Sequence, residues 1–163
     1  MGGFTALTGM AACAAAGHLA ARYLIARDRR LAVWEEALLR MEGELRRGGA
    51  ELPALLRRSA GESLPALAAL ADRLSADPAA APEKLLAALP GEPLLQREEE
   101  AALRQCLTAL FTPDLDRQRR ALSMALEQWA LFRGKAREAK DKNARLYRSL
   151  GWLSGAALMI LLC

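Results

Sequence analysis

Few residues of this chain could perform chemistry. His18 is the only histidine and lies in an uncharged stretch, so no histidine-based triad or metal cluster is available to the rest of the chain. Glu98, Glu99 and Glu100 could supply carboxylates, but consecutive residues of a helix point in different directions, so we expect a solvated charged face. There is no phosphate-binding glycine loop. The sequence predicts a protein that is not an enzyme and that holds no cofactor and no metal.

The cysteines do not suggest a metal site. Cys13, Cys106 and Cys163 are an odd set without ligand spacing. We expect small apolar side chains in a reducing compartment. Lipid attachment at Cys13 is an alternative, which the absence of a basic start disfavours.

The charges all lie in the middle of the chain. None precedes Arg22 and none follows Arg148, although the chain carries 23 basic and 19 acidic residues. Two uncharged ends around a charge-dense middle indicate lipid at both ends. Richness in Ala, Leu, Glu and Arg favours helix over strand. The predicted fold is all-α: a cytoplasmic helical bundle flanked by N-terminal and C-terminal transmembrane helices, with boundaries 1–25, 26–145 and 146–163.

The first uncharged stretch, extended to Ile25, is long enough for a helix to cross a bilayer. The basic residues follow it instead of preceding it, which predicts an uncleaved anchor with its amino terminus outside the cytoplasm. These membrane-flanking residues are Arg22, Arg27, Arg29 and Arg30. Small residues recur at every fourth position, at Gly9, Cys13, Gly17 and Ala21, and such a stripe lets another helix approach closely. His18 could sit neutral, reach the interface or act as a relay.

The second uncharged stretch is short. Its fifteen residues, 149–163, span about 22 Å as a helix, so a crossing needs Leu146 and Tyr147, with Arg145 and Arg148 flanking it on the cytoplasmic side. Gly151 and Gly155 form a GxxxG pair for transmembrane packing, either on the first anchor or on a neighbouring subunit in a homo-oligomer. A buried carboxy-terminal core helix is the alternative.

The middle of the chain has helical periodicity. Its first seam runs through Leu31, Trp34, Leu38, Met41 and Leu45 and ends at Gly48. Further helices are expected near 53–59, 64–74 (capped by Ser63), 83–88 and 94–111, and a last helix is expected to start at Thr112-Pro113-Asp114 and to run without a break into the apolar tail. Basic and acidic residues alternate, which excludes a nucleic-acid surface and suits membrane lipid headgroups near the ends.

The stretch from Glu138 to Gly155, EAKDKNARLYRSLGWLSG, with the aliphatic tail after it, resembles stage III sporulation protein AB. Asp114 and Gln118 match the D-x-x-x-Q element of that family, and Glu44 and Pro53 fall near its E-x-x…P-L element. Phe111 and Ala54 depart from the family pattern, at positions where a glycine and a leucine are usual.

The resemblance implies a place in the mother-cell membrane around the forespore, with the bundle in the cytoplasm. The family resembles the F-type inner-membrane platform proteins of type II secretion. Its implied partners are a cytoplasmic ATPase like stage III sporulation protein AA and the other subunits of a channel complex. No catalytic residues are implied, and the partner interface is unknown. A membrane-anchored helical adaptor or regulator unrelated to secretion is the alternative.

Overall fold

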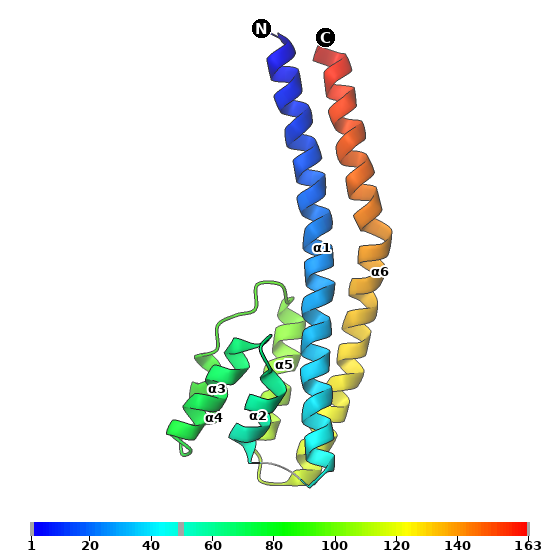
Figure 1. Cartoon of the computed structure of the whole chain (residues 1–163). Helices are drawn as coiled ribbons and strands as arrows, with labels where there is room; N and C mark the ends of the chain where they lie inside the picture. Colours follow the sequence, from blue (N-terminus) through cyan, green and yellow to red (C-terminus); the bar gives the residue numbers. More distant parts are fainter. Residues whose placement is uncertain (1, 49–50, 163) are drawn as a thin grey trace. The chain divides into compact units, whose positions relative to one another are not determined.

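The computed structural model describes the backbone of residues 2–48 and 51–162. The side chains of residues 2–10, 13–14, 144–145, 148, 151–152, 154–156 and 158–162 are outside that description. The described residues form helices α1 (Gly2–Arg46), α2 (Leu52–Ala60), α3 (Pro65–Ala76), α4 (Pro82–Ala87), α5 (Arg97–Leu110) and α6 (Leu115–Leu162), joined by loops without strands (Figure 1). The all-α prediction is confirmed.

The chain divides into two compact units. Unit 1 comprises residues 1–29 and 134–163, and unit 2 comprises residues 30–133. Helices α1 and α6 contribute to both, since neither is interrupted, and Gly134 does not break α6. These units are defined by contacts within the chain. The predicted boundaries at 25/26 and 145/146 instead separate membrane segments from the bundle, and they stay predictions.

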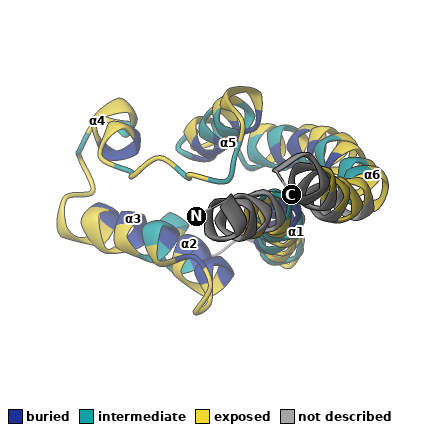
Figure 2. Cartoon of the chain, turned by 90° about the horizontal axis from the view of Figure 1, so that it is seen from above, coloured by how far each residue is buried: buried dark blue, intermediate teal, exposed yellow. Residues whose placement is uncertain are grey.

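Unit 2 has an aliphatic core that the periodicity predicts well. α2 packs on α3, and smaller contacts join α3 to α4 and α4 to α5. Each helix turns a buried stripe inward and an exposed stripe outward (Figure 2). The first seam is confirmed in full, and the other helices also bury apolar residues; those buried are Leu31, Trp34, Leu38, Met41, Leu45, Leu64, Leu67, Ala71, Leu74, Leu103, Cys106, Leu107, Leu110, Leu122 and Trp129. Leu115, Leu126 and Phe132, which the periodicity of the last helix also places inward, are half-buried.

Trp129 joins the two long helices within unit 2. Its indole is fully buried, and its Nε1 donates a hydrogen bond of 3.0 Å to the carbonyl oxygen of Leu31. The ring of Phe132 meets it edge to face, with centroids 6.0 Å apart. Close by, Arg133 of α6 forms an ion pair with Glu35 of α1. A buried indole with a satisfied N–H therefore links α1 to α6 in unit 2.

Two predicted helix caps are wrong. Pro53 and Pro65 lie in first turns, as expected. The residue before α3, however, is Leu64, and the carbonyl of Ser63 instead accepts a hydrogen bond of 2.9 Å from Arg30. At the start of α6 the capping side chain is that of Asp114, not the hydroxyl of Thr112. A carboxylate accepts backbone N–H bonds at a helix start more strongly than a neutral hydroxyl does.

In unit 1 the amino-terminal part of α1 and the carboxy-terminal part of α6 lie side by side and antiparallel (Figure 1). Lys140 of α6 reaches Asp28 of α1, with Nζ 2.6 Å from Oδ2. About two turns before Asp28, Ala21 is completely buried although its side chain is a single methyl group. A methyl group is buried to this degree only where a neighbouring helix comes close to the backbone.

Candidate functional site

Large apolar side chains are exposed on both helices of unit 1. On α1 the side chains of Leu19 and Tyr23 are exposed to 64% and 50%, and on α6 Leu146, Leu150 and Leu153 are exposed to 54%, 57% and 65%. Large apolar side chains cost free energy in water, about 25 cal/mol for each Å² exposed. Grouped exposed residues of this kind mark a surface that is covered by another apolar phase or protein.

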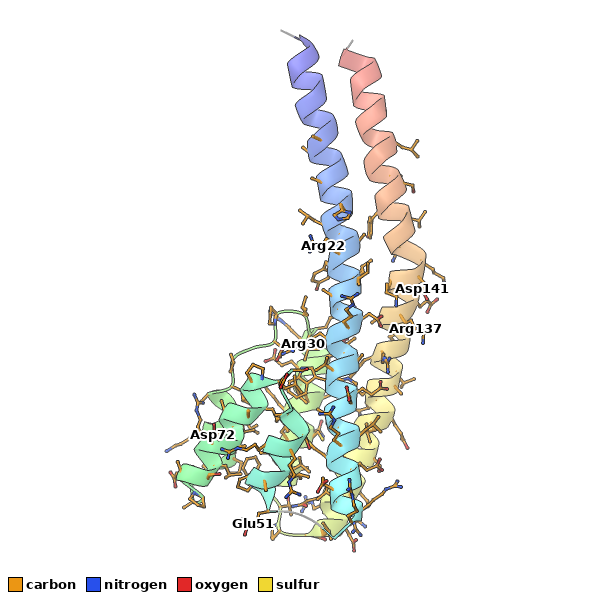
Figure 3. All side chains as sticks on the ribbon, viewed as in Figure 1. Arg22, Arg30, Glu51, Asp72, Arg137 and Asp141 are labelled. Atoms are coloured by element: carbon orange, nitrogen blue, oxygen red, sulfur yellow. The ribbon has the colours of Figure 1, made fainter. Side chains whose placement is uncertain are left out.

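The predicted membrane-flanking arginines have different environments. Arg22 and Arg29 are exposed, and Arg27 is buried. Arg30, which is labelled in Figure 3 and begins unit 2, binds the carboxylate of Glu92 with two nitrogens. Its position is thereby set by the loop before α5. The side chains of Arg145 and Arg148 lie outside the described residues.

The predicted packing glycines are described only in part. Gly17 is half-buried, one turn from the buried Ala21, so the small stripe of α1 faces inward over this turn. Gly9, Gly151 and Gly155 lie outside the residues whose burial the structure describes. His18, next to Gly17, is exposed.

Within the described residues, no helix contains an apolar stretch long enough to cross a membrane. Much of the predicted segments 1–25 and 146–163 falls on side chains outside that description, so the crossings stay predictions. No cluster of histidine, cysteine and carboxylate side chains in the described part of the chain could hold a metal ion.

Unit 2 carries a shallow surface hollow of about 690 Å³ between α2, the end of α3 and Phe111. Arg57 and Arg58 lie at its edge, but each is engaged, by Asp72 and by Glu44 respectively. The hollow therefore presents compensated ion pairs and the apolar edges of Leu52 and Pro53, among others, with no converging reactive groups. Such a surface suits contact with a protein better than catalysis.

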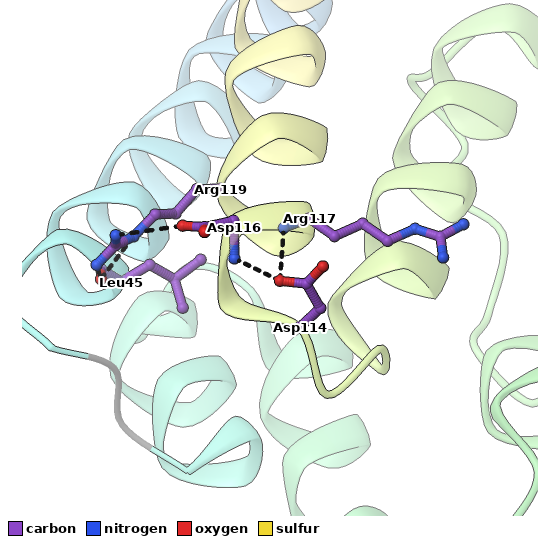
Figure 4. A network of polar contacts seen from close by, with 5 residues as sticks. All are labelled: Leu45, Asp114, Asp116, Arg117 and Arg119. Carbon is purple, nitrogen blue, oxygen red and sulfur yellow. Dashed lines mark hydrogen bonds and ion pairs between the residues drawn. The ribbon is translucent and has the colours of Figure 1, made fainter.

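The turn between α5 and α6 is held by an extended polar network (Figure 4). Oδ1 of Asp114 accepts the backbone N–H groups of Asp116 and Arg117 at 3.0 and 3.3 Å. Nε2 of Gln118 donates to the carbonyl oxygens of Leu110 and Thr112, at 2.9 and 2.6 Å. Gln118 thus satisfies carbonyls at the end of α5, and Asp114 satisfies amides at the start of α6.

Arg119 extends this network to α1. Its guanidinium donates to the carbonyl oxygen of Leu45, with Nη2 2.8 Å away, and also lies 3.8 Å from the carboxylate of Asp116 (Figure 4). Leu45 belongs to the last turn of α1, where carbonyls have no partner within the helix. A cation there also complements the negative end of the helix dipole.

Two titratable side chains of α5, those of Glu99 and Cys106, are buried. Glu99 is buried, not part of a solvated face, because its carboxylate accepts the backbone N–H of Gln96 at 2.7 Å and caps the start of α5. Burial raises the pKa of the Cys106 thiol to about 12. The thiol is therefore protonated and inert at neutral pH, in keeping with the expected packing role.

Comparison with known proteins identifies the chain. The family model for stage III sporulation protein AB matches residues 4–163. The chain belongs to the stage III sporulation protein AB family. No curated protein and no solved structure matches it.

The residues that carried the resemblance have structural roles in this family member. Asp114, which precedes α6, and Gln118 in its first turn hold the α5–α6 turn. Glu44 receives Arg58 of α2, and Pro53 begins that helix. The two motif elements therefore fix the connections between helices. Phe111, which departs from the family pattern, lines the surface hollow.

Proposed function

We propose that this protein is a non-catalytic membrane platform of the sporulation channel between mother cell and forespore. In this role, unit 1 anchors the chain in the mother-cell membrane, and unit 2 docks a cytoplasmic secretion-type ATPase. Membership of the stage III sporulation family supports the process. The grouping of exposed leucines and tyrosines on both helices of unit 1 supports the anchor, and it is the observation that carries the proposal.

The charge distribution supports the division of labour. The exposed surface of unit 2 bears many ion pairs, such as Glu36 with Arg40 and Glu42 with Arg46. Charged side chains of this kind are well solvated, so this surface suits contact with water. Unit 1 has no charged residue before Arg22 and none after Arg148. An ATPase would supply the chemical energy, and the platform would supply position.

The anchor is tested by fractionation of cells that express the full chain. We expect the protein in the membrane fraction after extraction at alkaline pH. A variant with Leu146, Leu150 and Leu153 replaced by Ser should be released, whereas the matched variant with the exposed Leu39, Met124 and Leu131 of unit 2 replaced by Ser should stay. Recovery of the unchanged protein in the soluble fraction would refute the anchor.

Topology is tested by labelling with an impermeant thiol reagent in cells without a wall. Cys106 is unsuitable because its thiol is buried, so the cytoplasmic reporter is Ser123→Cys on the exposed face of α6. We expect Cys163 to react in intact cells and the Ser123→Cys thiol only after permeabilisation. The reverse pattern would overturn the proposed orientation.

The docking role is tested with a purified secretion-type ATPase of the sporulation class. We expect it to bind proteoliposomes that carry the full chain and not protein-free liposomes of the same lipid. Equal binding to both would refute docking and favour an adaptor with a different partner.

A further inference from the structure

We propose that, within one molecule, the GxxxG pair of α6 packs against the small-residue stripe of α1, in a register selected by the ion pair between Asp28 and Lys140. This pairing belongs to unit 1 and does not rest on the proposed function, because it is expected in a membrane and in detergent alike.

The direction of the GxxxG pair follows from the exposed leucines of α6. In a helix, residues two positions apart point to opposite sides, since each residue turns by about 100°. Leu153 is exposed to 65%, and Leu146 and Leu150 lie on the same exposed face. Positions 151 and 155, two before and two after Leu153, therefore fall on the side away from this face, which is the side toward α1.

The direction of the small-residue stripe on α1 follows from the burial of its members and the exposure of the residue between them. Ala21 is fully buried and Gly17 is half-buried, whereas Leu19, between them, is exposed to 64%. Positions 9 and 13 continue the same four-residue spacing along α1. On each helix the small-residue positions thus fall on the side opposite the exposed leucines.

The register of the two helices follows from the ion pair of Asp28 with Lys140. In an antiparallel pair, each step toward the start of α1 corresponds to one step toward the end of α6. From the ion pair of Asp28 with Lys140, eleven steps lead to Gly17 and Gly151, and fifteen lead to Cys13 and Gly155.

Small-residue packing alone does not select one register. A stripe with a small residue at every fourth position packs almost as well after a slip of one turn, because Gly151 and Gly155 would again meet members of the stripe. Packing alone is therefore degenerate. A slip of four residues in either direction would instead place Ala136 or Ala144 opposite Asp28, and the half-buried carboxylate would lose its cation.

The native Cys13 gives a direct test on the full chain in detergent. In a Cys163→Ser background, the Gly155→Cys variant should form an intramolecular disulfide with Cys13 on mild oxidation, because close-packed backbones meet the short Cα distance that a disulfide needs. The matched control is Leu153→Cys, on the exposed face. We expect at least a tenfold higher yield at 155, measured by mass spectrometry of linked peptides from the monomer band. Equal yields, or disulfides mainly between chains, would overturn the proposal.

The role of the ion pair is tested by shifting the reporter. Gly151→Cys and Met159→Cys lie opposite Cys13 only after a slip of one turn in either direction. We expect yields at least fivefold below that of Gly155→Cys, rising toward it when Lys140→Ala removes the cation. Exchange of the two charges, Asp28→Lys with Lys140→Asp, should restore the preference for position 155. An unchanged preference in Lys140→Ala would show that the ion pair does not select the register.

A second pair of cysteines controls for a folding defect in Gly155→Cys. Gly17→Cys with Gly151→Cys, in a Cys13→Ala and Cys163→Ser background, should cross-link in the same register. Failure of both pairs in chains whose helix content by circular dichroism is unchanged would refute close packing.

Discussion

Replacing Trp129 by alanine should be among the most destabilising single changes in unit 2. The indole is fully buried, donates to the Leu31 carbonyl and packs edge to face on Phe132. A buried aromatic side chain covers ~150–250 Å², and the ring pair adds ~1 kcal/mol. Since the intrahelical partner of the Leu31 carbonyl remains, no buried acceptor is orphaned. We expect a loss of ~4 kcal/mol, within the range seen when large aromatic residues are truncated in a core.

The assay uses the buried thiol of Cys106 as a reporter of unit 2 in the full chain. With Cys13 and Cys163 replaced by alanine, a short pulse of thiol reagent labels only molecules whose unit 2 is unfolded, because the native thiol is buried and its pKa lies near 12. Labelling against urea concentration gives a midpoint. For a slope of ~2 kcal/mol per M, a loss of ~4 kcal/mol lowers the midpoint by ~2 M.

The matched control is Leu131→Ala, two residues further along α6. Leu131 is 67% exposed, so this truncation should change the free energy of unfolding by no more than ~0.5 kcal/mol. Trp129→Phe should fall between the two, since it keeps a ring but loses the donor. A midpoint for Trp129→Ala within ~0.5 M of the control would refute the argument that the indole is the main link between the long helices in unit 2.

Three further predictions concern the rest of the molecule. Gln118→Ala should cost ~1–2 kcal/mol in the same assay because two carbonyls lose their donor, and Gln118→Glu should do no better because a carboxylate cannot donate to them; a neutral result for Gln118→Ala would contradict the clamp. Because the folded-state pKa of Cys106 is raised to about 12, its contribution to stability should be constant below about pH 8 and fall by ~1.4 kcal/mol per pH unit from about 9 toward 12. Unfolding followed by tryptophan fluorescence should therefore show a steeper loss of stability over this range for the unchanged protein than for Cys106→Ala. A fragment of residues 27–145 should be soluble and mostly helical by circular dichroism, with a cooperative thermal transition; a strand-dominated spectrum or no transition would refute this.

The fold could be predicted from sequence because its determinants are periodic. The seam from Leu31 to Leu45 repeats at three and four residues, and such a repeat leaves a helix one face to bury. Prolines at the starts of α2, α3 and α4 are local signals of the same kind. Both depend on neighbours in sequence, so no knowledge of the tertiary arrangement was needed.

The ends of the helices could not be predicted in the same way. Several arginines that a sequence presents as surface charges donate to carbonyls at helix ends or in loops far along the chain. Arg119 reaches Leu45, Arg104 reaches the Leu86 carbonyl at 2.7 Å, and Arg73 reaches the Ala88 carbonyl at 3.0 Å. Which carbonyl an arginine meets depends on how the helices pack, and no local pattern encodes this. Glu99 is the acidic counterpart, with a local signal, the Gln96–Glu99 spacing, that could have been found.

These arginines also bear on how a helical protein with few aromatic residues can hold its helices in register. Aliphatic seams alone allow neighbouring helices to slide, because leucine faces are interchangeable along a helix. A guanidinium that must reach one particular carbonyl makes sliding costly, since the carbonyl at the end of the helix would lose its partner. In unit 2 this fixes α1 to α6 through Arg119 and α4 to α5 through Arg104. The ion pair of Asp28 with Lys140 would serve the same purpose in unit 1, where the small-residue faces are even less selective. In unit 2, charged groups therefore select the register of helices that their apolar seams alone would leave free to slide.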